Sequence, residues 1–437
     1  MTYPEALRYL ESFVNYEKID GYSYESSLKL EKMKRFASLL GDPQDRTRSV
    51  HIAGSKGKGS TATYVYSILK NAGFKTGLYT SPHLVDFRER IKIDDRLISE
   101  KELASILDRI RGVIEEHMAD DSPSFFEVYT ALAYIYFKEQ KCDFAVYEVG
   151  LGGRLDATNI INPLVSAITP LSYEHTDKLG DTLSQIAAEK CGIIKSHSIC
   201  VSAPQGTEAL KVIESTCSAR STRLILVGRD IKYEEISSDE AGQVFNISGV
   251  FGEYPALKSR LIGAHQIVNA ATAIGVIEGL RLRDVKISPG SIRTGIDQAF
   301  WPGRLEIVKR SPYIVLDGAQ NEASAGVLAS AIRKIFKYKK LILILGVSKD
   351  KDIKGILKTL MPISDSIILT KSKLISRAME PEAIKEHTAS DRAVVTSNVD
   401  DALKEASSMA GKEDMILVTG SLFVVGEARA NLAQGTH

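Results

Sequence analysis

Mostly apolar runs alternate with amphipathic stretches along the first three hundred residues. The run 144–149 is apolar except for one carboxylate, as in a strand buried on both faces. Segments such as 99–116 repeat apolar residues at helical spacing. Residues 1–40 predict two amphipathic helices, and residues 231–260 predict a β-rich excursion. Strands separated by helices predict a mainly parallel sheet with right-handed crossovers.

The pattern restarts after a break at residues 300–303, where Phe-Trp-Pro-Gly interrupts it. Beyond the break, strand-like runs again alternate with helical patterns, of which 323–336 is the clearest. The predicted strands there are Tyr313–Leu316, Leu341–Leu345, Ser366–Thr370 and Met415–Val418. We therefore predict an α/β protein of two domains. Residues 1–298 form a P-loop-type, mainly parallel sheet domain, and residues 299–437 form a smaller Rossmann-like α/β domain.

A glycine-rich loop, Gly54-Ser55-Lys56-Gly57-Lys58-Gly59-Ser60, joins a strand-like run to a helical run. Such a loop turns backbone N–H groups onto an anion, and the following helix adds its positive dipole end. Lys58 is placed to reach terminal phosphates, and Ser60 to contact a phosphate or Mg²⁺. Only two residues separate Gly54 from Gly57, so the spacing departs from the common phosphate-loop pattern. An ordinary glycine-rich turn with an exposed lysine is the alternative.

Other polar residues suggest a functional role only when they are considered together with this loop. Glu148 ends a buried strand, where a carboxylate needs a partner or a metal; a solvated acid at a strand end is the alternative. The glycines after it suit a plain turn, which does not explain Arg154 and Asp156. His175 alone would be an ordinary loop histidine, and Lys190 alone a surface lysine on a helix. Phe125 is more typical of a core than of a ligand contact.

Composition limits the classes of function. The chain has 437 residues, 56 basic and 55 acidic side chains and a net charge of +1, so nothing indicates binding to nucleic acid or to an anionic membrane. No apolar run is long enough to span a bilayer, and the first residues lack a signal-peptide core. Four cysteines without paired spacing predict reduced thiols in a cytoplasmic protein. We expect a monomer.

Taken together, these motifs resemble the folylpolyglutamate synthase/dihydrofolate synthase family, a branch of the Mur-type amide ligases. The resemblance covers nearly the whole chain, and the long segment that follows Glu148 is its most specific part. Its segments are Gly54–Ser60, Thr80–Leu84, Glu148–Asn159, Glu174–Gly180, Glu189–Lys195, His265–Thr272, Pro302–Arg304 and Leu316–Ala319. This order of segments implies ATP and Mg²⁺ as cofactors and an amide ligase as the activity.

The resemblance also implies roles for individual residues. The implied ATP contacts are Gly57, Lys58, Gly59, Ser60, Asn269, Arg304 and Asp317. The implied Mg²⁺ ligands are Ser81, Glu148 and His175. The implied catalytic groups are Lys58, His175 and Lys190, the last of which matches a lysine that carries a carbamate. The pterin-bearing substrate would lie near Phe125, Leu155, Asp156 and Ala157.

The implied reaction adds L-glutamate to folate, and dihydropteroate is a further candidate substrate, through an acyl phosphate. Two departures from the family pattern stand out: Ser55-Lys56 before Gly57, and Gln320 where the family usually has histidine. Gln320 puts in question a contact near the phosphates and not the reaction class. A Mur-type ligase acting on a UDP-muramoyl precursor is the alternative enzyme, and a P-loop switch or binding module without amide chemistry is the alternative class.

Overall fold

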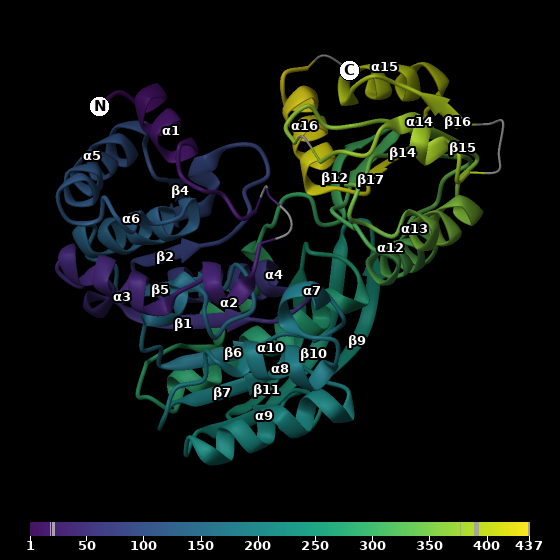
Figure 1. The fold of residues 1–437 in the computed structure, drawn as a ribbon. Coiled ribbons are helices and arrows are strands. Elements are labelled where there is room, and N and C mark those ends of the chain that lie inside the picture. The colour runs from purple at the N-terminus through teal and green to yellow at the C-terminus, as the bar shows by residue number, and fades with distance from the viewer. Residues whose placement is uncertain (18, 20–21, 376, 389–392, 436–437) are drawn as a thin grey trace.

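The chain folds into two lobes, each built on a mainly parallel β-sheet with helices packed against its faces (Figure 1). The computed structural model describes residues 1–17, 19, 22–375, 377–388 and 393–435. The α/β class predicted from the hydrophobic pattern is confirmed.

The larger lobe contains an eight-stranded sheet in the order β4-β3-β2-β5-β1-β6-β7-β8. Strands β2, β5, β1, β6, β7 and β8 run parallel, and β3 and β4 continue the sheet as antiparallel edge strands. The strands are β1 (Arg48–Ala53), β2 (Thr76–Tyr79), β3 (Ile91–Ile93), β4 (Arg96–Leu97), β5 (Phe144–Glu148), β6 (Val165–Ile168), β7 (Ile199–Ser202) and β8 (Arg223–Leu226).

Helices cover both faces of this sheet and create separate apolar cores. One core joins α4, α10 and α11 to the sheet, and a second joins α1, α3, α5 and α6 to it. The α-helices of this lobe are α1 (Tyr3–Glu11), α2 (Tyr24–Ser27), α3 (Leu30–Leu39), α4 (Lys58–Asn71), α5 (Glu100–His117), α6 (Phe125–Glu139), α7 (Thr176–Leu179), α8 (Leu183–Cys191), α9 (Thr207–Ala219), α10 (Ala264–Arg281) and α11 (Pro289–Gln298). Its 3-10 turns are η1 (Pro43–Arg46), η2 (Phe87–Arg90) and η3 (Ala157–Ile160).

A three-stranded antiparallel sheet forms the predicted β-rich excursion and reaches the smaller lobe (Figure 1). Its strands are β9 (Lys232–Asp239), β10 (Gly242–Gly249) and β11 (Gly252–Ser259). Glu235 on β9 forms an ion pair with Lys334, whose Nζ lies 2.6 Å from Glu235 Oε1. Arg310 Nη2 donates a hydrogen bond to the Glu240 carbonyl oxygen at 3.1 Å. This sheet therefore connects the two lobes on the side away from the amino terminus.

The smaller lobe contains a six-stranded sheet in the order β12-β13-β17-β14-β15-β16, parallel except for β12. The strands are β12 (Glu306–Arg310), β13 (Tyr313–Leu316), β14 (Leu341–Leu345), β15 (Ser366–Leu369), β16 (Ala393–Val395) and β17 (Met415–Thr419). The helices are α12 (Glu322–Ile335), α13 (Ile353–Leu360), α14 (Pro381–Lys385), α15 (Val399–Met409) and α16 (Leu422–Ala433), with the 3-10 turn η4 (Met361–Ile363).

Two local features differ from the hydrophobic pattern. The second predicted amino-terminal helix is broken into α2 and α3, because Leu28 and Lys29 adopt extended backbone. Strand β12 was not predicted, because as an edge strand it has no fully buried residue and its sequence lacks an apolar run. In the described part of the chain, no helix is both long and apolar enough to cross a membrane.

The connection between the lobes belongs in part to the larger one. Ala299 is 1% exposed and lies in the core that contains α4 and α10, and Trp301 packs against that same core. Gly303 has a φ of 70°, which suits glycine, at the point where the chain enters the smaller lobe. The domain boundary at residues 298/299 stays a prediction, and these contacts favour placing it a few residues later.

Candidate active site

The glycine-rich loop follows β1 and ends where α4 begins at Lys58. Gly57 caps the helix with a φ of 85°. A Cβ added to Gly57 would lie 2.2 Å from Asn269 Oδ1, and one added to Gly54 would lie 1.9 Å from Thr169 Oγ1. Close packing therefore requires glycine at both positions. It also places Asn269, which lies on α10, directly against the predicted phosphate loop.

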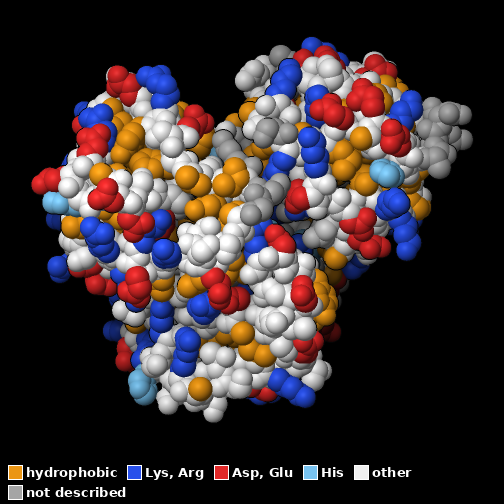
Figure 2. Space-filling view, viewed as in Figure 1, with side chains coloured by type: hydrophobic (Ala, Val, Ile, Leu, Met, Phe, Trp, Pro, Cys, Tyr) orange, Lys and Arg blue, Asp and Glu red, His pale blue; other side chains and the backbone are white. Residues whose placement is uncertain are grey.

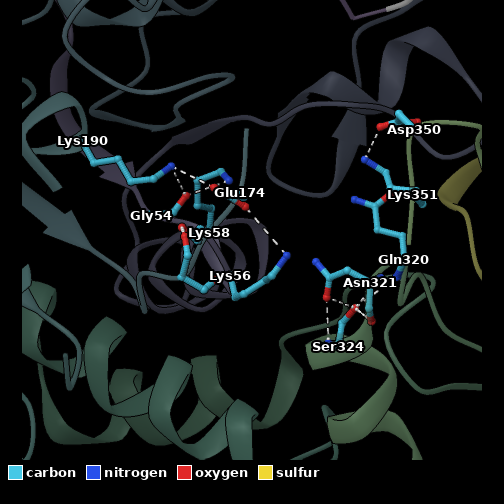
Figure 3. Close-up of polar contacts among 12 residues, drawn as sticks. Gly54, Lys56, Lys58, Glu174, Lys190, Gln320, Asn321, Ser324, Asp350 and Lys351 are labelled. Atoms are coloured by element: carbon cyan, nitrogen blue, oxygen red, sulfur yellow. Dashed lines mark hydrogen bonds and ion pairs between the residues drawn. The ribbon is translucent and has the colours of Figure 1, made fainter. Parts of the chain in front are cut away.

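Two lysines meet at one carbonyl oxygen of this loop (Figure 3). Lys58 Nζ and Lys190 Nζ each donate a hydrogen bond to the Gly54 carbonyl oxygen at 3.0 Å. Lys190 is 2% exposed, so it is not a surface lysine. Desolvation lowers its pKa to about 8 against the opposing effect of Glu174. The structure thus brings together two residues that are 132 positions apart in the sequence.

Glu174 is the anion at the centre of this lysine cluster (Figure 3). Its Oε1 accepts a hydrogen bond from Lys190 Nζ at 2.9 Å, and its Oε2 lies 3.8 Å from Lys56 Nζ. Desolvation opposes ionisation of Glu174, but Lys190, Lys58 and Lys56 outweigh it and hold the pKa at about 2. Sequence reasoning gave no role to Glu174 or Lys56, because no local pattern indicates that residues 56, 174 and 190 converge.

Glu148 and Ser81, which the family resemblance implies as Mg²⁺ ligands, also meet in the structure. Glu148 ends β5 next to β1, with Ile52 as its partner in the register. The backbone N–H of Ser81 donates a long hydrogen bond of 3.3 Å to Glu148 Oε2. Glu148 is 5% exposed. Desolvation raises the pKa of its carboxyl group to about 7, and the charge of Lys58 is the largest effect that opposes this rise. A buried carboxylate with so little hydrogen bonding is suited to bind a cation.

His175 stands beside this cluster with a φ of 49°, immediately before α7. The residue is exposed. Partial desolvation lowers its pKa, opposed by Glu174 and reinforced by Lys190 and Lys351, so the ring is held neutral. A neutral imidazole is the form that binds metals. No group of three His, Cys, Asp or Glu side chains able to hold a metal occurs among the described residues, so a metal here would also need a serine hydroxyl, water or phosphate oxygens.

The smaller lobe presents Arg304 and Asp317 to the same region. Asp317 follows β13, and its carboxylate accepts hydrogen bonds from the backbone N–H groups of Leu305 and Ala319, each at 2.9 Å. Desolvation raises the Asp317 pKa, with Arg304 as the main opposing charge. The half-buried Arg304 makes no hydrogen bond or ion pair within the described part of the chain. Its guanidinium therefore remains available to an anion.

Residues of the smaller lobe also lie across from the lysine cluster (Figure 3). Gln320 precedes Asn321, which caps α12, and the Gln320 backbone N–H donates to Ser324 Oγ at 3.1 Å. The charge of Lys351 contributes to lowering the pKa of both Lys56 and His175, so it faces the same space. Trp301 packs over Gly59, where an added Cβ would lie 2.8 Å from Trp301 Cζ2. The contact of Trp301 with the phosphate loop was not predicted.

The four predicted substrate-binding residues differ in how accessible they are. Phe125 is 1% exposed and lies in a core, whereas its neighbour Phe126 is half-buried and abuts Gly150. Asp156 is 3% exposed and accepts hydrogen bonds from the N–H groups of Thr158 and Leu151 at 3.0 and 2.9 Å. Ala157 is 6% exposed, and Leu155 packs beside a small apolar cluster. Their roles toward a substrate stay predictions.

The surface is notched between the two lobes, and hydrophobic side chains gather on the larger lobe's side of the notch (Figure 2). Three lysines and an arginine surround the carboxylates of Glu148 and Glu174: Lys56, Lys58, Lys190 and Arg304. Such an arrangement can bind a multiply charged anion, neutralise charge that develops on it, and hold an apolar partner next to it.

Comparisons with known proteins agree with this geometry. Residues 52–277 match the Mur ligase middle domain, and residues 303–422 match the Mur ligase glutamate ligase domain. The chain is 32% identical over 407 residues to a Bacillus subtilis dihydrofolate synthase/folylpolyglutamate synthase, covering 92% of this chain and 94% of that protein.

Two solved structures are similar over almost their whole length. Mycobacterium tuberculosis folylpolyglutamate synthase complexed with ADP superposes with a TM-score of 0.88 at 31% identity, covering 98% of this chain and 97% of that one. Escherichia coli FolC in complex with DHPP and ADP superposes with a TM-score of 0.87 at 30% identity, covering 100% and 99%. The chain therefore belongs to the folylpolyglutamate synthase/dihydrofolate synthase family of Mur ligases.

Proposed function

We propose that the protein is an ATP-dependent ligase that adds L-glutamate to folates such as tetrahydrofolate and, as a second acceptor, to dihydropteroate. One observation carries the proposal: Lys58 and Lys190 share the Gly54 carbonyl oxygen of a phosphate loop, beside the buried carboxylate of Glu148. Family membership supports a folate or dihydropteroate acceptor over a UDP-muramoyl acceptor, because the relatives reported above are named as dihydrofolate synthase or folylpolyglutamate synthase.

ATP would bind at the phosphate loop, with its terminal phosphates toward the smaller lobe. Backbone N–H groups from Gly57 to Ser60 open α4 and suit phosphate oxygens, because they have no helical partner. Lys58 would reach the same oxygens. Asn269 is packed against Gly57, within reach of a nucleotide on that side. Arg304 and Asp317 would contact ATP from the smaller lobe.

The residues present fit Mg²⁺, the metal that nucleotide phosphates require. Glu148 supplies a buried carboxylate with a raised pKa, His175 a neutral imidazole and Ser81 a hydroxyl. These are few and mainly oxygen donors, as expected of a site in which phosphate and water complete the coordination. When bound, Mg²⁺ supplies charge neutralisation for the phosphate oxygens.

Lys190 fits the carbamate that the family resemblance implies. A carbamate forms on an uncharged amine, and desolvation lowers the Lys190 pKa to about 8. The modification would replace a buried cation by an anion on the same side chain. We propose that this anion then helps to orient the groups that face the phosphates.

In the reaction, a substrate carboxylate attacks the γ-phosphorus of ATP, the bond to the bridging oxygen breaks and ADP leaves. The amine of glutamate then attacks the acyl carbon of the acyl phosphate, a C–N bond forms, the C–O bond breaks and phosphate leaves. Lys58 and Arg304 hold the transferred phosphoryl group and stabilise its charge. Closing the cleft between the lobes protects the acyl phosphate from water.

The test is a substrate panel in which ADP release and product mass are measured with L-glutamate and one acceptor at a time. The acceptors are tetrahydrofolate, dihydropteroate and a UDP-muramoyl peptide. We expect a product one glutamate heavier with tetrahydrofolate. A product from the muramoyl peptide alone would replace the proposal by the cell-wall alternative, and ATP hydrolysis that ignores every acceptor would favour a switch. We further propose that the protein acts in the cytoplasm as a monomer. Sedimentation would check the oligomeric state.

A further inference from the structure

A buried arginine links the amino-terminal segment to the loop that carries Ser81. Arg90 ends η2, and its residue is 2% exposed. Its guanidinium binds Glu17 in a bidentate pair, with Nη1 2.8 Å from Oε1 and Nη2 2.6 Å from Oε2. Glu17 lies between α1 and α2, 73 positions earlier in the chain, and its side chain is 30% exposed. Parallel N–H···O bonds of this kind fix orientation as well as charge.

The third donor of the same guanidinium holds His83. Arg90 Nε donates to His83 Nδ1 at 3.0 Å. Because arginine can only donate, this nitrogen of His83 must carry a lone pair, which fixes both the tautomer and the ring orientation. His83 follows Ser81 by two positions, and Ser81 is itself tied to Glu148. The loop is thus held at one end by the predicted metal-binding carboxylate and at the other by Arg90.

The faces of the guanidinium meet aromatic rings of α6. The Arg90 Cζ atom lies 5.3 Å from the centre of the Phe125 ring and 5.6 Å from that of Tyr129. Tyr129 donates its hydroxyl hydrogen to the Phe87 carbonyl oxygen at 2.5 Å, and the His83 and Phe87 rings lie 4.4 Å apart. One charged group therefore joins three segments: the amino-terminal segment, the Ser81 loop and the first turn of α6.

The amino-terminal segment itself carries aromatic rings. Tyr16 and Tyr22 flank Glu17 and lie 4.5 Å apart, and Lys178 Nζ lies 4.7 Å from the Tyr22 ring, close to His175 in sequence. Aromatic rings of this kind suit a flat, largely apolar acceptor, whereas the predicted phosphate loop follows β1, on the other side of β5 from the Ser81 loop. Burying the charge of an arginine is a costly way to gain stability alone, which makes a positional role the better account.

We propose that Arg90 is a positioning residue for the acceptor substrate: Glu17 fixes its guanidinium, which in turn fixes His83 and packs on the enclosed Phe125 ring. This packing holds the start of α6, where the half-buried Phe126 follows Phe125, as one wall of the acceptor site. The inference rests on the proposed function. It predicts that weakening the pair disturbs acceptor binding more than ATP binding, because Arg90 makes no hydrogen bond to the predicted ATP contacts in the described part of the chain and acts on Glu148 only through its charge.

The experiment measures kcat, the KM for tetrahydrofolate and the KM for ATP in the full-length chain, together with the thermal midpoint. Glu17→Gln should raise the KM for tetrahydrofolate about tenfold and change the KM for ATP by less than about twofold. Arg90→Lys keeps the charge but loses the fork, so it should show the same split. The matched control is Glu139→Gln, which breaks another bidentate pair: Arg109 binds Glu139 at 2.5 and 3.0 Å, with side chains 55% and 41% exposed. The control should change neither KM.

Three outcomes would count against the inference. Glu17→Gln with an unchanged KM for tetrahydrofolate would overturn it. So would an equal change in both KM values with a lowered thermal midpoint, because that pattern describes a merely structural ion pair. Arg90→Lys could unfold the lobe, and the partly exposed Glu17 then remains the decisive position. If the unaltered chain ligates glutamate to no pteridine, the proposed function fails first, and this inference fails with it.

Discussion

The two sheets share an architecture but differ in the polar groups at the carboxyl ends of their strands. Both are mainly parallel, and strands such as β5 in the larger lobe and β14 in the smaller are buried along their whole length. In the larger lobe the strand ends lead to Glu148, Lys58 and Glu174, whose charges are buried or closely packed against one another. In the smaller lobe the corresponding acid, Asp317, accepts hydrogen bonds from the backbone N–H groups of Leu305 and Ala319.

This difference indicates that most of the charged groups expected to act on a substrate belong to the larger lobe. Groups that are desolvated and set against like charges cost stability, and they are found where an anion or a cation is expected to bind. The larger lobe places Glu148, Lys58 and Glu174 at or after the ends of three adjacent strands, β5, β1 and β6, whereas the smaller lobe mainly contributes Arg304 from the segment that enters it. The following experiments test that division, from the largest expected effect to the smallest.

Removing the smaller lobe should abolish the reaction. A chain ending after Pro302 keeps Ala299 and Trp301, which pack on the larger lobe's core, and we expect it to fold. It lacks Arg304 and Asp317, so it should bind ATP weakly and form no glutamate product. The measurement compares product mass and circular dichroism of residues 1–302 with the intact chain. Substantial ligation by the shortened chain would show that the smaller lobe is dispensable.

Lys58→Ala should be the most damaging single change in the larger lobe. It removes a charged donor aimed at the phosphates, for which a loss of about two to three orders of magnitude in kcat is expected. The fold should persist, because within the described part of the chain the Lys58 side chain makes one hydrogen bond, to the Gly54 carbonyl oxygen. Lys138→Ala, which removes an exposed lysine from α6, is the control. A folded Lys58 variant with near-normal ADP release would reject the phosphate-loop assignment.

Lys190→Ala should lower turnover about 10- to 100-fold, because a group that orients metal-facing residues is lost. If Lys190 acts as a carbamate, added acetate should restore part of the activity by supplying a carboxylate in the vacated space. The control is Lys211→Ala, which changes an exposed residue on α9. It should keep normal turnover, and acetate should not change its activity. Full activity of the Lys190 variant without acetate would remove this lysine from the site.

Much of the larger lobe could be predicted from the sequence, because its signals are local. The glycine spacing, the apolar run ending in Glu148 and the helix starts are each confined to a few adjacent residues. The structure also brings Ser81 to Glu148 and Lys190 to the loop, in agreement with the family resemblance. The sequence alone placed the break between the lobes near residue 300, and Trp301 lies there, packed on Gly59.

The remaining features depend on distant contacts that no local pattern contains. Glu174 stood in a recognised segment without a role, because nothing nearby indicates that it faces Lys190 and Lys56. Arg90 and Glu17 are ordinary charged residues in sequence, and only folding brings them together. Phe125 and Phe126 are adjacent, and the sequence could not tell which one is enclosed in the core. Edge strand β12 lacked an apolar run altogether.

The smallest expected effect concerns acid stability, which should differ between the lobes because of one buried histidine in β1. His51 is fully buried, its Nε2 lies 2.8 Å from Thr158 Oγ1, and its Nδ1 has no partner among the described residues. Desolvation, and then the charge of Lys195, lowers its pKa to about 3 from an ordinary value of 6.5. In the described part of the smaller lobe, the one histidine, His387, is exposed.

Between pH 6.5 and 3 the unfolded chain therefore binds a proton at His51 that the folded chain does not bind. The stability that depends on a neutral His51 is complete above pH 6.5 and falls as the pH is lowered, by about 2 kcal/mol at pH 5. Trp301 is the chain's single tryptophan and packs on Gly59, so denaturant unfolding followed by its fluorescence at pH 7 and pH 5 reports on the larger lobe. His51→Gln should lose clearly less stability over that interval. An equal loss in both proteins would mean that the acid sensitivity arises elsewhere.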